Sequence, residues 1–176
     1  TLACALATAR WAAAVAPGGN GRIIFVSSTV TPEHPEGEPG IFSMSADGSD
    51  RRQLTGDGVT FEHANIGLAV SPDGRQIAFS DDTRDIHLMN VDGSNLQRIT
   101  TGLFSYGPLA WSPDGSKIAY IQVGVRHDIW VMNTDGSNRT LLTNNASSIN
   151  TRPDWSPDGS QIVYEANPPG GGGMGI

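Results

Sequence analysis

The sequence is short of cysteine and of positive charge, and each shortage excludes a class of function. Cys4 is the single cysteine, which is too few for an internal disulfide or a thiolate metal site. Lysine and arginine number 11 against 18 aspartate and glutamate residues, and the net charge is −7. Nucleic-acid phosphates and anionic lipids attract basic surfaces. We therefore expect neither a nucleic acid nor an anionic membrane surface as a partner.

The sequence also lacks common signatures of catalysis. It contains no Gly-x-Ser-x-Gly nucleophile elbow, no His-Glu-x-x-His zinc motif and no Gly-x-x-x-x-Gly-Lys-Ser/Thr loop. The histidines are far apart in the sequence and suggest no shared metal site; they are His34, His63, His87 and His127. We therefore predict no enzyme activity, no cofactor and no metal site.

No hydrophobic run is long enough to span a bilayer. The Ala-rich opening Thr1–Ala16 is interrupted by Arg10 and falls short of the roughly 20 apolar residues of a spanning helix. It resembles the end of a secretory signal, with small-x-small cleavage patterns at Ala7–Ala9 and Ala12–Ala14. An Ala-rich leader that is retained is the alternative. We predict a leader over residues 1–19 and a protein that is periplasmic or otherwise exported.

Glycine, proline and an internal repeat dominate the rest of the chain. The 22 glycines and 11 prolines suit many short strands joined by turns. Three motifs recur in one order with a period of 41 to 45 residues. Ser-Pro-Asp-Gly begins at Ser71, Ser112 and Ser156; Asp-Gly-Ser begins at Asp47, Asp92 and Asp135; Ile-x-x-Met begins at Ile41, Ile86 and Ile129. A fixed order over this period indicates a repeat architecture.

Each repeat predicts four short antiparallel strands. In the clearest copy, Leu109–Trp111 leads into the turn Ser112–Gly115, in which proline and glycine set the backbone angles. The alternating segment Lys117–Ile121 follows, and then Asp128–Asn133, an Asp-Gly hairpin turn, and Arg139–Thr143. Four strands per 40 to 45 residues is typical of a β-propeller blade.

Other all-β folds fit the pattern less well. A sandwich would not repeat three motifs in one order, and a parallel β-helix has shorter repeats. We therefore predict an all-β propeller in residues 20–176, with equivalent second strands near Ile23–Ser27, Ile77–Ser80, Ile118–Ile121 and Ile162–Glu165.

These motifs resemble the WD-like repeat of the TolB-like β-propeller family. The best match runs from Trp111 to Thr143; Val70–Thr100 is close, and Ile23–Thr55 departs more because of an insertion over Thr29–Gly40. The resemblance implies a ring of six blades. We expect about three to three and a half blades here, in an open arc, with no innermost strand before Arg22 for the first blade.

The repeated polar and aromatic residues are interpreted as structural. Asp73, Asp114 and Asp158 offer one carboxylate per turn, too few for a calcium loop, so we expect each to stabilise its own turn. Trp111 and Trp155 share a repeat position, which favours packing between blades over ligand stacking.

The candidate binding residues are those that vary just before each innermost strand. Ligands of propellers commonly bind at the rim of the central channel, where these strands begin. The candidates are polar or aromatic and differ between repeats, although ordinary loop variation would look similar; they are His63, Asn65, Tyr106, Asn150 and Arg152.

The resemblance implies a non-enzymatic, protein-binding scaffold of the bacterial cell envelope. By resemblance, its partners would be a peptidoglycan-associated lipoprotein and other Tol components. One alternative is the propeller cap of a prolyl-oligopeptidase-like serine hydrolase whose catalytic domain is absent from this chain. Another is a propeller that binds solutes or glycans.

An open arc should self-associate through its two uncovered blade faces. Burying about 500 Å² of apolar area on each face would contribute on the order of 12 kcal/mol before entropy costs. We expect light scattering to show association that increases with protein concentration. A monomer at high concentration with cooperative melting would contradict this expectation.

Overall fold

The computed structural model describes residues 12–13, 21–29, 38–56, 59, 61, 67–105, 107–124, 127–144 and 149–167. All regular structure in these ranges is β-strand, and none is helix. Accordingly, these ranges contain no helix with the length and hydropathy needed to span a bilayer.

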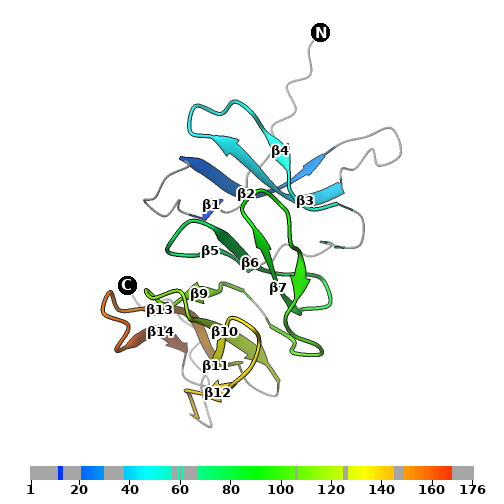
Figure 1. Ribbon diagram of the computed structural model, residues 1–176. Helices are drawn as coiled ribbons and strands as arrows, with labels where there is room; N and C mark the ends of the chain where they lie inside the picture. The colour runs from blue at the N-terminus through cyan, green and yellow to red at the C-terminus, as the bar shows by residue number, and fades with distance from the viewer. Residues whose placement is uncertain are drawn as a thin grey trace.

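The strands form three sets of four and one pair, which we call blades 1 to 3 and the half-blade (Figure 1). Blade 1 contains β1 (Ala12–Ala13), β2 (Arg22–Thr29), β3 (Glu38–Ser45) and β4 (Arg52–Gln53). Blade 2 contains β5 (Leu68–Val70), β6 (Gln76–Ser80), β7 (Ile86–Asn90) and β8 (Gln97–Arg98). Blade 3 contains β9 (Ala110–Trp111), β10 (Lys117–Val123), β11 (His127–Asn133) and β12 (Thr140–Leu141). The half-blade contains β13 (Ile149–Trp155) and β14 (Ile162–Asn167).

The predicted propeller arc is confirmed. The four expected second strands are β2, β6, β10 and β14, and consecutive strands within each blade pair antiparallel. Figure 1 shows the blades arranged one after another without closing a ring. One irregularity joins the last two sets, because His127 of β11 pairs in parallel with Ile149 of β13.

The expectation that blade 1 has no innermost strand is wrong. β1 pairs antiparallel with β2, with Ala12 opposite Phe25 and Ala13 opposite Ile24. An edge strand is held by backbone hydrogen bonds, so it needs no alternating side-chain pattern, and an Ala-rich segment gives no such signal. The segment predicted as a leader, residues 1–19, therefore includes a strand at Ala12–Ala13.

The Ser-Pro-Asp-Gly turns are held by their own side chains. In the turn before β10, the Ser112 hydroxyl donates to the Asp114 carboxylate over 2.5 Å and accepts from the Lys117 backbone N–H over 2.9 Å. The hydrogen bond from Ser112, with others from the Ser116 backbone and hydroxyl, lowers the pKa of Asp114 to about 2. Asp158 is held in the same way and has the same lowered pKa. This geometry confirms the structural interpretation of these aspartates.

Neighbouring blades pack through apolar faces. Between blades 1 and 2 the cluster contains Ile24, Ile41, Phe61, Ile77, Phe79 and Met89. Between blades 2 and 3 it contains Ala78, Ile86, Leu88, Leu103, Leu109, Trp111, Ile118, Tyr120 and Met132. Most of these side chains are almost completely buried, so the blade interfaces form the hydrophobic core.

Equivalent cross-strand pairs in the blades differ in side-chain size. The pair consists of one residue from the second strand and its partner on the third strand, and both are buried in every blade. The pairs are Ile24–Ser43 in blade 1, Ala78–Leu88 in blade 2 and Ala119–Val131 in blade 3. A large residue therefore lies on the second strand in blade 1 and on the third strand in blades 2 and 3.

Tryptophan side chains link the innermost strands of neighbouring blades. The Trp111 indole N–H donates to the Ala69 carbonyl over 3.2 Å, and the Trp155 indole N–H donates to the Ala110 carbonyl over 3.2 Å. Both residues therefore pack between blades, as expected.

The Asp-Gly-Ser turns of blades 2 and 3 lie against residues that directly follow the outermost strand of the blade before. A Cβ at Gly136 would lie 2.1 Å from the Ile99 carbonyl oxygen, and a Cβ at Gly93 would lie 2.8 Å from the Leu54 carbonyl oxygen. Gly48, at the same turn position in blade 1, has nothing within 4 Å of such a Cβ.

Gly136→Ala should destabilise the protein more than Gly48→Ala. Both residues have a positive φ, 81° and 83°, so each alanine should cost about 1 kcal/mol in backbone strain. Only at Gly136 does the new methyl group collide with a neighbouring blade, which should add about 1–3 kcal/mol. Urea denaturation of the two variants measures this difference, and equal losses would contradict the observed blade contact.

Candidate functional site

The predicted channel-rim residues lie where the innermost strands β5, β9 and β13 begin. Three of them, His63, Asn65 and Tyr106, fall outside the described residues. The other two, Asn150 and Arg152, lie on β13. The rim therefore remains a prediction, and its described part is the start of the half-blade.

Asn150 connects the half-blade to blade 3. Its side chain is fully buried, and its amide Nδ2 donates to the His127 carbonyl over 3.1 Å and to the Thr143 hydroxyl over 3.2 Å. Its Oδ1 atom is buried and has no hydrogen-bond partner among the described residues. In this structure the side chain positions β13 against blade 3.

Arg152 is the described rim residue that solvent and ligands can reach. It has a φ of 53° and lies at a register shift between Thr151 and Asp154. A β-bulge of this kind redirects a side chain out of the regular alternation. The guanidinium Nη1 lies 2.9 Å from Glu165 Oε1, and both side chains are more than half exposed. Such an exposed ion pair contributes little to stability, so the arginine is available to a partner.

Asp85, which was not among the predicted site residues, is a buried carboxylate at the same end of blade 2. It is 1% exposed and accepts hydrogen bonds from the Gly102 and Leu103 backbone N–H groups over 3.1 and 3.0 Å. The Thr100 hydroxyl and Arg98 Nη2 also donate to it. Asp85 thereby holds the connection from β8 toward blade 3.

A repeat signal could have identified this residue. Asp85 and Asp128 both come directly before the Ile-x-x-Met motif, and each accepts from the threonine that ends its repeat, Thr100 or Thr143. The threonine hydroxyl in turn accepts from the backbone N–H of Ile86 or Ile129. The threonine at the end of the repeat therefore links the aspartate to the backbone of the following isoleucine, and this contact is a structural element of the blade.

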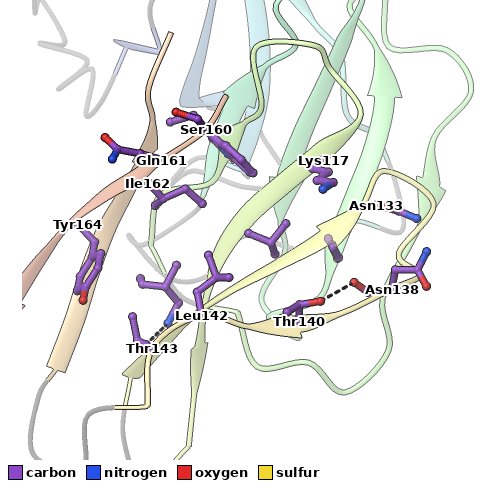
Figure 2. A pocket seen from close by; sticks show the side chains of 14 residues that line it. Lys117, Asn133, Asn138, Thr140, Leu142, Thr143, Ser160, Gln161, Ile162 and Tyr164 are labelled. Carbon is purple, nitrogen blue, oxygen red and sulfur yellow. Dashed lines mark hydrogen bonds between the residues drawn. The ribbon is translucent and has the colours of Figure 1, made fainter. Parts of the chain in front are cut away.

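The hollow within the described residues lies between blade 3 and the half-blade. This cleft has a volume of about 550 Å³, and its apolar lining includes Val131, Leu142, Trp155, Ile162 and Tyr164. Figure 2 shows the Leu142 and Ile162 side chains on facing walls of the cleft. Leu142 is 49% exposed and Tyr164 is 39% exposed, so large apolar groups meet solvent here.

The described residues contain no group of three or more histidine, cysteine, aspartate or glutamate side chains arranged to hold a metal ion.

Comparison with known proteins supplies the family. No protein-family model matches the chain. An uncharacterized protein of Agrobacterium fabrum is 33% identical over 142 residues, covering 70% of this chain and 46% of the relative. A TolB homologue of Chlorobium luteolum is 30% identical over 146 residues, covering 81% of this chain and 32% of the relative. The Tol-Pal system protein TolB of Alcanivorax borkumensis is 41% identical over 71 residues, covering 38% and 16%.

The chain is a TolB-like β-propeller. The solved structure of a protein assigned as TolB from Agrobacterium tumefaciens superposes with a TM-score of 0.65 at 25% identity, covering 86% of this chain and 53% of that one. TolB from Acinetobacter baumannii superposes with a TM-score of 0.63 at 21% identity, covering 86% and 36%, and supports the fold alone.

This TolB-like chain spans less than half of the length of the curated relatives it matches. The chain is also similar to a peptidase. Dipeptidyl-peptidase 5 of Porphyromonas endodontalis is 29% identical over 112 residues, covering 57% of this chain and 16% of the relative.

Asp85→Asn should lower the free energy of unfolding by about 2–3 kcal/mol, because the amide leaves buried donors without an acceptor. Although burial opposes ionisation, hydrogen bonds from Leu103, Gly102 and Thr100 and the Arg98 charge hold the pKa of Asp85 below its usual range. Its stabilisation is therefore complete above the ordinary Asp pKa of about 3.9 and is lost as the pH falls toward the lowered value. Denaturant titrations from neutral to acidic pH measure both effects.

Asp128→Asn is the matched control for this prediction. Asp128 holds the equivalent position but is only half-buried, and it accepts from the Thr143 hydroxyl over 3.1 Å. We expect Asp128→Asn to lower the free energy of unfolding by about 1 kcal/mol or less. Equal losses in the two variants would mean that the network around Asp85 has no special role.

Proposed function

We propose that this chain is the protein-binding propeller of a TolB-type scaffold, exported to the bacterial cell envelope, and that it carries no catalytic activity of its own. The observation that carries the proposal is the match to two TolB relatives, one of which covers 81% of this chain. The A. borkumensis relative is described as part of the Tol-Pal system. We therefore propose a peptidoglycan-associated lipoprotein, with other Tol components, as the partner.

The proposed binding surface is the channel rim at the start of the innermost strands. The bulge at Arg152 directs a cation out of the regular strand alternation, and the side chain is largely exposed. A cationic group at this position would suit a partner segment with carboxylate and aromatic groups. The sequence places the other candidates, His63, Asn65 and Tyr106, before the innermost strands of blades 2 and 3. Asn150 would support this surface indirectly, since it is buried.

A second candidate function is the propeller cap of a prolyl-oligopeptidase-like serine hydrolase. The match to dipeptidyl-peptidase 5 favours this candidate, although that match covers less of this chain than the C. luteolum match does. In that case catalysis would come from a separate domain, and the propeller would limit access to it. A propeller that binds solutes or glycans is a third candidate.

A direct binding assay tests the proposed function. We expect the purified chain to bind a purified peptidoglycan-associated lipoprotein without its lipid anchor, as measured by biolayer interferometry. Arg152→Ala and Tyr106→Ala should each weaken binding about tenfold, equivalent to about 1.4 kcal/mol. Arg75→Ala is the matched control, because Arg75 is exposed and follows a turn at the opposite end of the strands.

The possible outcomes test the proposed partner and the proposed site independently. Absence of binding would contradict the proposed partner, and binding that the rim variants leave unchanged would contradict the rim as its site. Hydrolysis of peptide substrates by the purified chain, abolished by a single substitution, would contradict the proposed lack of catalysis.

A further inference from the structure

Phe104 is an exposed aromatic residue in the connection between blades 2 and 3. It is 56% exposed, more than any other aromatic residue in the described ranges. It follows β8 and precedes β9, so it lies between two four-stranded blades and away from the cleft beside β14. A single exposed apolar residue is common on protein surfaces, but the backbone of this one is held in an unusual way.

Phe104 has a left-handed backbone conformation, with a φ of 55°. Bulky residues rarely adopt this region, and they remain in it only where the surrounding structure enforces it. On the side of blade 2, the Leu103 backbone N–H donates to the Asp85 carboxylate over 3.0 Å. The Ser105 backbone N–H donates to the Arg84 carbonyl over 2.7 Å. The residues before and after Phe104 are therefore both fixed to blade 2.

The same connection is also fixed to blade 3. The Phe104 carbonyl accepts from the Val123 backbone N–H over 3.0 Å, and Ser105 forms an isolated antiparallel bridge with Gln122. Both partners belong to β10. The backbone of Phe104 is thus held between two blades, and its side chain is directed to solvent.

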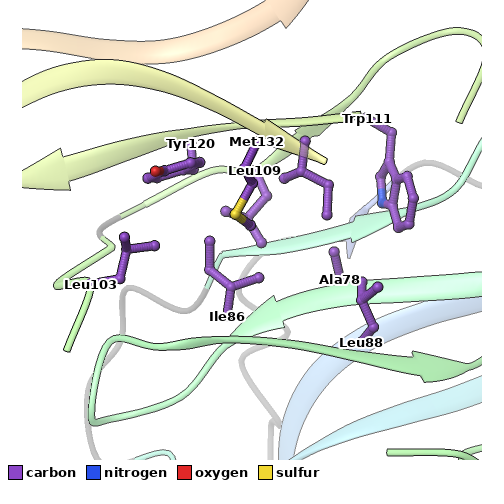
Figure 3. Packing of buried hydrophobic residues seen from close by; sticks show 9 residues of the cluster. Ala78, Ile86, Leu88, Leu103, Leu109, Trp111, Tyr120 and Met132 are labelled. Atoms are coloured by element: carbon purple, nitrogen blue, oxygen red, sulfur yellow. The ribbon is translucent and has the colours of Figure 1, made fainter. Parts of the chain in front are cut away.

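The residue before Phe104 is anchored in the hydrophobic core. Leu103 is 3% exposed and belongs to the cluster between blades 2 and 3. Figure 3 shows its side chain among those of Ile86 and Tyr120. Leu103 therefore occupies the inward position of this connection, and Phe104 takes the outward one.

The connection between blades 1 and 2 shows a different arrangement. Its phenylalanine, Phe61, is 3% exposed, and its ring centroid lies 5.8 Å from that of Phe79 in the core. Both connections carry a phenylalanine, but only Phe104 leaves its ring in solvent. Backbone strain and an exposed apolar ring both oppose stability, and strain of this kind is concentrated at binding sites.

The exposed charge beside this ring is positive. In the loop of residues 81–85 the aspartates are half-buried or buried, and the exposed residues are Thr83 and Arg84. The Arg84 carbonyl accepts from the residue that follows Phe104, so the cation and the ring lie on hydrogen-bonded segments. A guanidinium pairs strongly with carboxylates. The pair therefore suits a ligand that presents an apolar side chain close to a carboxylate.

We propose that Phe104 and Arg84 bind an acidic peptide segment of a protein partner, with an apolar side chain of the segment on the Phe104 ring and a carboxylate on Arg84. Asp85 is a positioning residue of this site, because it holds the Leu103 N–H. Hydrogen bonds fix the backbone before binding, so less conformational entropy is lost when the segment binds. The inference rests on the proposed protein-binding function but not on the identity of the partner.

A library of random dodecapeptides displayed on phage tests the proposal without assuming a partner. The full chain is immobilised, and the Phe104→Asn variant in solution removes peptides that bind elsewhere. Asparagine adopts a positive φ more readily than phenylalanine, so this variant should keep the urea midpoint of the original chain. We expect enriched peptides in which an aliphatic or aromatic residue lies near an aspartate or glutamate.

Variants of the chain then define the contacts, with synthetic copies of the enriched peptides in fluorescence anisotropy. Phe104→Tyr keeps an aromatic ring and should weaken binding less than about threefold, whereas Phe104→Asn should weaken it at least about tenfold. Arg84→Gln should weaken binding and remove most of its dependence on salt concentration. Leu96→Asn is the matched control without effect, because Leu96 is 43% exposed and lies at the opposite end of blade 2.

Three results would overturn the proposal. One is a selection that enriches no peptide over the Phe104→Asn competitor. Another is a set of enriched peptides without acidic residues, or binding that Arg84→Gln leaves unchanged. The third is a large fall in the urea midpoint of Phe104→Asn, which would identify the ring as a structural element. Failure of the lipoprotein alone to bind, with peptides that behave as expected, would contradict only the proposed partner.

Discussion

Packing between neighbouring blades is the interaction on which the rest of this structure depends. Each blade has only short strands, and a sheet of this size buries too little surface to be stable alone. A fully buried residue such as Ile77 or Phe79 contributes about 1.5–3 kcal/mol, whereas a typical hydrogen bond contributes about 1 kcal/mol. Several such residues lie at each interface, so apolar contact between blades outweighs any single polar contact within them.

The polar contacts determine geometry more than total stability. Terminal threonines satisfy the first backbone N–H of the third strand, tryptophans join innermost strands, and serine with aspartate closes the turns. Each contact occurs at least twice at equivalent positions. The same set of contacts therefore recurs at successive blade interfaces. The candidate rim residues lie at positions that this set does not include, and their residue types vary between repeats.

The repeat made most of the fold predictable. Because the Ser-Pro-Asp-Gly and Asp-Gly-Ser turns carry their own backbone requirements, the first located β6, β10 and β14 and the second located β3, β7 and β11. β1 was not predictable, because backbone pairing alone holds it and its alanines carry no pattern. The burial of Asn150 was also not predictable, because an asparagine can occur both at an exposed channel rim and at a buried contact between blades.

The site was less predictable than the fold. Asp85 is buried because backbone N–H groups of the following connection converge on it, and a connection's path is a property of tertiary structure. The cleft depends on residues from β11, β12 and β14 together. The repeat position of Asp85 can be read from the sequence, but its burial cannot, and the cleft belongs to no single motif.

The alternation of large and small residues in the buried cross-strand pairs has a consequence for how the chain folds. Near-identical repeats risk exchanging strands, because a third strand could pair with the second strand of the wrong blade. Such an exchange here would place Leu88 beside Ile24, two large groups in a space built for one, or Ser43 beside Ala78, which leaves a void. Both mismatches cost on the order of 1–3 kcal/mol. Side-chain size thus distinguishes blade 1 from blades 2 and 3, and it favours pairing of β2 with β3 over an exchange with blade 2.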